Sequence, residues 1–161
     1  MEKAFLNILL VDDDAKFLGS LAERIKLKGY EPITALDGKK AIEIAKRNMI
    51  HLAVVDQRLP DMEGLEVITK LKEIHPDIKT ILLTAYGDEK LKEATEALNS
   101  AYFDKDDMGK FWSFIRAALR KLETAMAAAG MASGGDLKDA VDIDSPEEKI
   151  DSNLETISFF H

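Results

Sequence analysis

The sequence alternates five times between a short apolar run and a segment with helical spacing of its apolar residues. The apolar runs cover residues 5–11, 30–35, 52–55, 79–84 and 101–103. In the segments between and after them, apolar positions recur at intervals of three and four residues, which is typical of amphipathic helices. Parallel strands need a crossover connection, most often a helix. The pattern therefore predicts an α/β fold with helices on both faces of a parallel sheet.

Capping and turn residues predict where several helices begin and end. The first helix covers residues 15–28 and closes at Gly29. Asp88 can cap the fourth helix, and Asn99 can end it because Asn tolerates the left-handed conformation. Asp107 can cap the long final helix.

Acidic residues follow the first and third apolar runs: Asp12, Asp13 and Asp14 after the first, and Asp56 after the third. A doubly wound, flavodoxin-like sheet with strand order 2-1-3-4-5 has its switch point between these two strands. That order would bring Asp12, Asp13 and Asp56 together, whereas Asp14 more readily caps the first helix. Clustered carboxylates repel one another, and a hard divalent cation relieves the repulsion. Mg²⁺ fits, because it takes few carboxylates and is often completed by phosphate oxygens.

Two further polar side chains follow neighbouring strands. Thr84 ends the fourth apolar run and can offer a hydroxyl to an anion bound on Asp56, while Lys105 follows the fifth run and can offer a positive charge. This set of groups suits phosphoryl transfer onto a carboxylate. Taken singly, Thr84 could be an ordinary strand-end hydroxyl and Lys105 a surface lysine.

Residues 5–123 resemble the receiver domain of bacterial two-component response regulators. The matching motifs are ILLVDDD, VVDQRLPDMEGLEVI, ILLTA and AYFDK, which occur in the order and at the spacings of that family. The resemblance implies that Asp56 accepts a phosphoryl group from the phosphohistidine of a sensor kinase. It also implies that Thr84 and Tyr102 form a switch pair and that Lys105 contacts the phosphoryl group. The Mg²⁺ ligands it implies are Asp12, Asp13, Asp56 and the backbone carbonyl of Arg58.

The chain departs from the family pattern after Lys105, where Asp106 replaces the usual proline with its cis peptide bond. A cis bond before a residue other than proline costs about 3 kcal/mol, so we expect a trans bond and an altered placement of Lys105. Arg58 and Tyr86 each lie two residues beyond a site residue. In the family such positions tune dephosphorylation, and two bulky groups would hinder attacking water.

The function implied is that of a single-domain response regulator rather than an enzyme. Phosphorylation of Asp56 would switch a protein-binding surface formed by the fourth helix, the fifth strand and the fifth helix. The implied partners are a sensor histidine kinase or phosphotransfer protein and a downstream protein target, and the same surface could pair two copies in a homodimer. The alternative is a receiver-like binding module that works without phosphorylation, as the departure at Asp106 suggests.

Charge and composition limit the other functions. The chain has a net charge of −8; residues 136–161 hold eight acids and two lysines, which leaves −2 on residues 1–135. Neither part has the basic surplus that binds nucleic acid directly. No apolar run approaches the ~20 residues of a membrane span, and the start does not read as a signal peptide. With no cysteine present, we expect a cytoplasmic protein away from the membrane.

We predict three segments: a receiver domain over residues 1–123, a helix extension and flexible linker over 124–135, and an acidic tail over 136–161. In the tail, Ser145-Pro146-Glu147-Glu148 matches a helix capping box. Apolar residues then repeat at helical spacing at Ile150, Leu154 and Ile157. Two interpretations remain open: a disordered tail, or a short amphipathic helix that docks in a groove on a partner or on the receiver itself.

Overall fold

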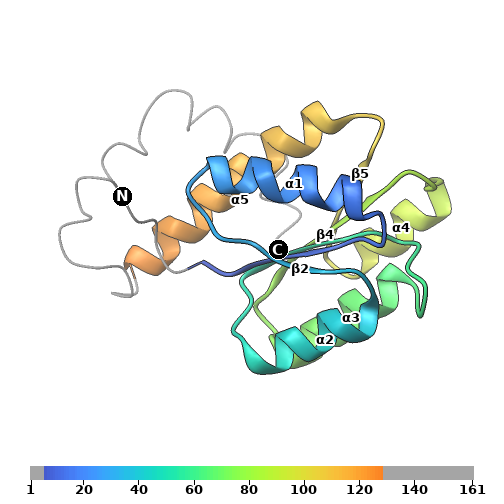
Figure 1. Cartoon of the computed structure of the whole chain (residues 1–161), viewed down its shortest axis with the longest axis horizontal. Helices are drawn as coiled ribbons and strands as arrows, with labels where there is room; N and C mark the ends of the chain where they lie inside the picture. Colours follow the sequence, from blue (N-terminus) through green and yellow to red (C-terminus); the bar gives the residue numbers. More distant parts are fainter. Residues whose placement is uncertain (1–5, 129–161) are drawn as a thin grey trace.

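The computed structural model describes residues 6–128. Its centre is a sheet of five parallel strands in the order β2-β1-β3-β4-β5, as predicted from the sequence (Figure 1). The strands are β1 (Ile8–Val11), β2 (Ile33–Ala35), β3 (Leu52–Val55), β4 (Lys79–Thr84) and β5 (Ala101–Asp104).

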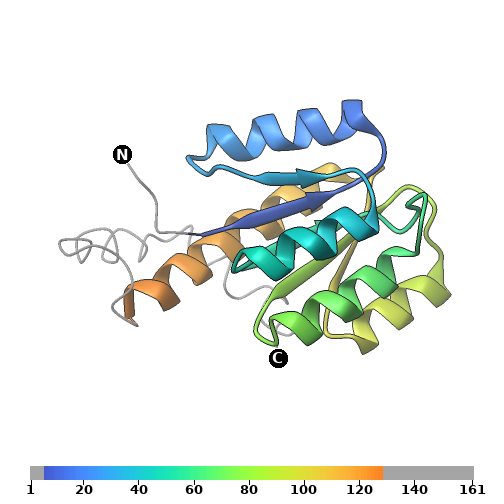
Figure 2. The same ribbon diagram turned by 60° about the horizontal axis from the view of Figure 1, so that its bottom comes forward.

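Five helices cover the two faces of the sheet. They are α1 (Ala15–Leu27), α2 (Gly38–Arg47), α3 (Gly64–Ile74), α4 (Glu89–Ala97) and α5 (Met108–Ala128). Figure 2 shows α1 and α5 on one side of the sheet, with α2, α3 and α4 on the other. Each side has its own apolar core, because alternate strand residues point to opposite faces: Leu10 packs with α1 and α5, and Leu9 packs with α2 and α3.

The strand register aligns the carboxyl ends of the strands. Val11 of β1 lies opposite Val55 of β3, and Thr84 of β4 lies opposite Asp104 of β5. The residues that follow these strands therefore meet at one edge of the sheet, where open α/β folds place their ligands.

Three of the predicted capping residues lie at observed helix ends, whereas no cap hydrogen bond to the Asp107 side chain is found in the described part of the chain. The Asp14 side chain accepts hydrogen bonds from the first amides of α1, and the Asp88 side chain accepts one from Leu91 of α4. Asn99 has a φ of 59°, the left-handed conformation expected after α4. Local capping chemistry therefore fixed these boundaries, because each cap uses residues within three or four positions.

Two strands begin later than predicted: β1 starts at Ile8 rather than at residue 5, and β2 is shorter as well. β2 begins at Ile33 rather than at Tyr30, since Pro32 has no N–H to donate to the sheet and the Tyr30 side chain is buried against α5, where its hydroxyl donates to Glu123. α5 continues past residue 123 to Ala128. The rest of the predicted linker and the whole acidic tail, residues 129–161, lie outside the described residues, as does residue 5 of the first predicted strand. Between Leu6 and Ala128, no helix is both long and apolar enough to cross a membrane.

Candidate functional site

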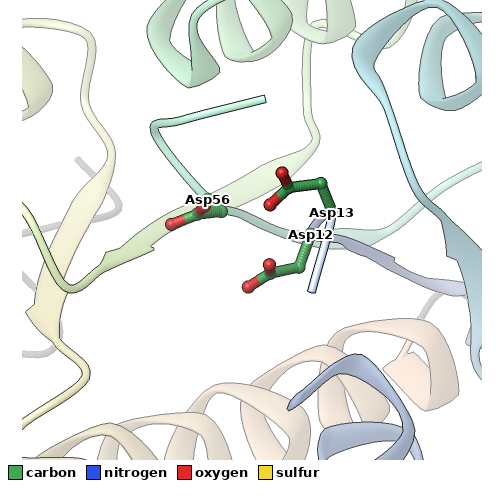
Figure 3. A group of neighbouring side chains, drawn as sticks. All are labelled: Asp12, Asp13 and Asp56. Atoms are coloured by element: carbon green, nitrogen blue, oxygen red, sulfur yellow. The ribbon is translucent and has the colours of Figure 1, made fainter. Parts of the chain in front are cut away.

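Three carboxylates meet at the carboxyl ends of β1 and β3. The backbone N–H of Asp12 donates to Ala35 (3.1 Å), and that of Asp56 donates to the carbonyl of Val11 (2.9 Å), so the sheet itself holds both residues. Asp12 and Asp56 are buried and Asp13 is exposed. Oxygens of the three side chains all lie within 4.8 Å of one another, and Figure 3 shows the three side chains extending toward the same side. The structure therefore brings together the acids that the strand order predicted.

Lys105 reaches this cluster from the loop after β5. Its Nζ lies 2.7 Å from Asp12 Oδ2 and 3.6 Å from Asp56 Oδ1. The same ammonium lies 4.2 Å from the centroid of the Phe17 ring. No peptide bond within residues 6–128 is cis, so the Lys105–Asp106 bond is trans, as expected. With this trans bond, the Lys105 ammonium contacts the acidic cluster.

One carboxylate oxygen of Asp56 lacks a hydrogen bond within residues 6–128, although the Lys105 ammonium lies 3.6 Å from it. This oxygen, Oδ1, is buried. Burial and the neighbouring Asp12 carboxylate raise the pKa of Asp56 to about 6, against the opposing effect of the Lys105 ammonium. A buried oxygen without a donor, beside two further carboxylates, is a donor set suited to a hard cation. The residues present therefore fit Mg²⁺.

Thr84 and Tyr102 lie on the neighbouring strands β4 and β5. Thr84 is fully buried, and its Oγ1 accepts a hydrogen bond from the Tyr86 N–H (3.2 Å). Tyr102 is partly buried beside the β4–α4 loop, where a Cβ added at Gly87 would be 1.5 Å from the tyrosine Oη. The two residues thus lie on either side of the β4–α4 loop, Thr84 at its start and Tyr102 packed against it.

Arg58 and Tyr86 contact each other between the β3–α3 and β4–α4 loops. The guanidinium of Arg58 lies 4.1 Å from the centroid of the Tyr86 ring, a cation–π distance. Tyr86 is 63% exposed, so the pair lies at the surface. Arg58 also forms an isolated antiparallel bridge with Glu63, which folds the loop back on itself. The two bulky residues that the sequence analysis singled out therefore form one stacked unit.

Two polar residues that the sequence analysis did not single out hold the β3–α3 loop in place. The side-chain oxygen of Gln57 accepts a hydrogen bond from Leu65 N (3.1 Å) in the first turn of α3. The Asp61 carboxylate accepts hydrogen bonds from Gly38 N (2.9 Å) and Lys39 N (2.8 Å) of α2. Polar side chains in loops give no distinctive pattern, so only the tertiary structure reveals these two roles.

The roles of Gly64 and Phe17 at the site were also not predicted from the sequence. A Cβ at Gly64 would lie 2.3 Å from the Asp56 carbonyl oxygen, so only glycine allows α3 to start this close to β3. Phe17 appears in the sequence as one apolar residue of the first helix, and its contact with Lys105 depends on packing between α1 and the β5–α5 loop. Of these two roles, only that of Gly64 had a signal in the sequence, namely a glycine directly after a polar loop.

The fold and this cluster define a class of α/β domains in which three acids and a lysine meet at the switch point of a doubly wound sheet. The family model described as the response regulator receiver domain matches residues 8–116. The chain belongs to this family.

Known relatives agree with this assignment. Sporulation initiation phosphotransferase F of Bacillus subtilis (strain 168) is 31% identical over 100 residues, covering 62% of this chain and 81% of that protein. A CheY-like receiver domain protein from Methanospirillum hungatei JF-1 has a TM-score of 0.69 and 28% identity, covering 74% of this chain and 98% of the other. A response regulator from Burkholderia pseudomallei, solved with a phosphorylated aspartic acid, a calcium ion and citrate, has a TM-score of 0.60 and 27% identity; the match covers 62% of this chain and 59% of that one. The chain spans only 21–25% of the length of three other curated relatives.

Proposed function

We propose that this chain is a response regulator that accepts a phosphoryl group on Asp56 in a Mg²⁺-dependent reaction. The observation that carries the proposal is the Asp56 carboxylate, buried at the end of a central strand with one oxygen lacking a hydrogen-bond donor. Beside it lie the acid pair and the ammonium of Lys105. A reactive carboxylate with a cation and candidate metal ligands beside it suits an incoming phosphoryl group.

The chemistry follows from the arrangement of these groups. With a pKa of about 6, Asp56 is mainly ionised at neutral pH and can attack phosphorus as a nucleophile. The phosphorus–nitrogen bond of a phosphohistidine donor breaks, and its electron pair stays on the imidazole. Lys105 neutralises charge on the transferred group. Asp12, Asp13, Asp56 and the Arg58 backbone carbonyl would hold Mg²⁺, which when bound neutralises the phosphoryl oxygens.

Phosphorylation would then act through the β4–α4 loop. The new charge on Asp56 attracts the Thr84 hydroxyl, which now accepts a hydrogen bond from Tyr86. Because Tyr102 packs against the same loop at Gly87, a shift of the loop changes the room available to the Tyr102 ring. This shifts the population of two arrangements of the surface made by α4, β5 and α5. That surface is our proposed site for a downstream protein or a second copy of the chain.

The partners follow from this chemistry. A phosphohistidine of a sensor kinase or phosphotransfer protein is the donor we propose, in the cytoplasm, with Asp56 as the acceptor and no other substrate. The phosphorylated aspartic acid and calcium ion of the Burkholderia pseudomallei relative support an acceptor carboxylate beside a divalent cation. The alternative is a binding module that works without phosphorylation. It was suggested by Asp106, which replaces the usual proline after Lys105. Lys105 contacts the acidic cluster despite this departure, so the observation that favoured the alternative loses its weight.

The proposal is tested by incubating the full chain with acetyl phosphate and Mg²⁺ and measuring its intact mass. We expect a mass gain of one phosphoryl group. Adding EDTA before acetyl phosphate should prevent this gain, and Asp56→Asn should not show it. Asp14→Asn is the matched control, because Asp14 lies at the same edge of the sheet and Asn can also cap α1. It should gain the phosphoryl group like the unmodified chain. No gain in the unmodified chain, or an equal gain in Asp56→Asn, would favour the phosphorylation-independent module.

A further inference from the structure

A groove of about 700 Å³ lies between α1 and the start of α5. Figures 1 and 2 both show these two helices on the same side of the sheet, away from α2, α3 and α4. Its apolar lining residues are Phe17, Leu21, Met108 and Trp112, and its basic ones are Lys16 and Arg24. Glu23 is the one acid that lines it. The groove is therefore mainly apolar, with basic side chains along α1.

Positive charges gather around Trp112. The guanidinium of Arg24 and the ammonium of Lys28 lie 4.4 Å and 5.5 Å from the centroid of its ring. Burial and the nearby charges of Arg116 and Arg24 lower the pKa of Lys28, in that order of importance. Three cations this close repel one another, so their arrangement favours an anionic ligand.

This cluster lacks counter-ions within the described part of the chain. None of the carboxylates between residues 6 and 128 lies within 4.0 Å of Arg24, Lys28 or Arg116. The Nε of Arg116 is buried and has no hydrogen-bond acceptor there. An apolar groove beside such a cluster fits an amphipathic peptide that carries acids next to its apolar face.

We propose that residues 145–157 of this chain dock in the α1–α5 groove as an amphipathic helix. At helical spacing, Ile150, Leu154 and Ile157 share one face. The acids of the adjoining face are Glu147, Glu148, Asp151 and Glu155. With Lys149 the segment has a net charge of −3, complementary to the basic groove. The apolar face packs against Phe17 and Trp112 while the acids pair with the cations of α1 and α5.

The intervening chain has the right length for docking within one molecule. Trp112 precedes Ala128 by 16 residues of α5, which is about 24 Å along the helix. Residues 129–144 are also 16 in number, and a random coil of that length has a root-mean-square span of about 22 Å. A linker whose span matches the distance gives an effective concentration of about 1 mM. This favours the chain's own segment over a second copy or a separate partner.

The docked segment would border the acidic site. Phe17 lines the groove and also packs under the Lys105 ammonium, at 4.2 Å from ring centroid to Nζ. Docking itself uses neither the acidic cluster nor phosphorylation, so it can be tested independently of the proposed function.

The full chain offers a direct test because it contains no cysteine. We would introduce Ser158→Cys, attach a nitroxide spin label and record amide NMR spectra of the isotope-labelled chain. Docking predicts a loss of peak intensity over residues 16–24 and 108–112, with none in α2 or α3. The loss should diminish at 1 M salt, where the Debye length is about 3 Å. A uniform loss, or none, overturns the proposal and leaves an external partner as the occupant.

Matched variants separate specific docking from general attraction. The four substitutions Glu147→Gln, Glu148→Gln, Asp151→Asn and Glu155→Gln should abolish the loss of intensity. Asp136→Asn, Asp139→Asn, Asp142→Asn and Asp144→Asn remove the same charge outside the proposed helix and should preserve it. On the groove side, Arg24→Glu should weaken the loss and Lys40→Glu, on α2, should not. The proposal is contradicted if the two fourfold variants lose the same intensity, or if Arg24→Glu and Lys40→Glu do.

A mixing experiment distinguishes docking within one chain from docking between two. Isotope-labelled chains without a spin label are combined with spin-labelled chains that carry no isotope. Docking within one chain predicts no loss of intensity over residues 16–24 in this mixture. If the mixture loses as much intensity as the sample in which each chain carries both labels, the groove binds a second copy and the proposal is overturned.

Discussion

The hydroxyl of Tyr102 lies against Gly87 so closely that a Cβ at that glycine would be 1.5 Å from the tyrosine oxygen. This contact joins β5 to the loop that follows Thr84. Side-chain volume at position 87 therefore decides how the Tyr102 ring packs. The packing of Tyr102, the proposed switch residue, against the β4–α4 loop therefore requires a residue without a Cβ at position 87.

Replacing Gly87 with Ala should displace the Tyr102 ring. The added methyl group would overlap the phenolic oxygen, so the partly exposed ring must move aside, and we expect the free energy of unfolding to fall by about 1 kcal/mol, the low end for overpacking. Gly19→Ala is the control, because nothing lies within 4 Å of a Cβ there and Ala favours the helix by up to about 1 kcal/mol. Urea unfolding of the two variants measures the difference, and equal stabilities would refute the contact.

Replacing Lys105 with Met should lower the free energy of unfolding, because two buried carboxylates lose their cation. Its ammonium contacts both Asp12 and Asp56, and removing one partner of a buried pair costs about 3 kcal/mol or more; partial exposure of Lys105 reduces this. Lys110→Met is the matched control, since its pair with Asp107 is exposed and contributes at most about 1 kcal/mol. Thermal or urea unfolding without metal compares the two. A Lys105 variant no less stable than the Lys110 variant would contradict this account.

The raised pKa of Asp56 predicts a pH dependence of stability in the absence of metal. The folded protein keeps a proton up to about pH 6 that the unfolded chain releases near the ordinary value of 3.8. The free energy of unfolding therefore falls as the pH rises through this range. Asp56→Asn removes the titrating group. Its free energy of unfolding should therefore exceed that of the unmodified chain by up to about 3 kcal/mol at pH 7, and the two values should be similar near pH 4. Urea unfolding in EDTA at both pH values provides the test, and a difference independent of pH would count against the shift.

The stacked pair of Arg58 and Tyr86 should lengthen the lifetime of a phosphoryl group on Asp56. Without either side chain, water has freer access to the site. A cation–π contact of about 0.5–1 kcal/mol corresponds to a rate of phosphoryl loss about 2- to 5-fold higher. The decay of the phosphorylated mass after removal of the donor measures this rate.

A double-mutant cycle separates the pair from its members. Because the two residues are in contact, Arg58→Ala and Tyr86→Ala should give a combined effect smaller than the sum of their separate effects. Arg47→Ala, on the exposed end of α2, should leave the decay unchanged. Additive effects of the two site variants would show that they act separately.

Much of the fold follows from local patterns in the sequence. Apolar runs predict the strands, helical spacing predicts the helices, and caps such as Asp14 and Asp88 mark their ends, because all three depend on residues a few positions apart. The strand order came from a topological rule rather than from any residue, yet it placed Asp12, Asp13 and Asp56 together. Where Pro32 interrupts the hydrogen bonds of the sheet, the predicted strand was too long.

The alternation of strands and helices, and the acids at the ends of the first and third strands, can be recognised in the amino-acid sequence alone. Only the tertiary structure decided which side chains meet: Arg58 with Tyr86, Tyr102 with Gly87, and Lys105 with Asp12 despite the missing proline. The α1–α5 groove and its cations around Trp112 likewise appear only once the helices pack. The physical reason is that periodicity encodes burial along one element, whereas these contacts join residues that are brought together by the packing of separate elements.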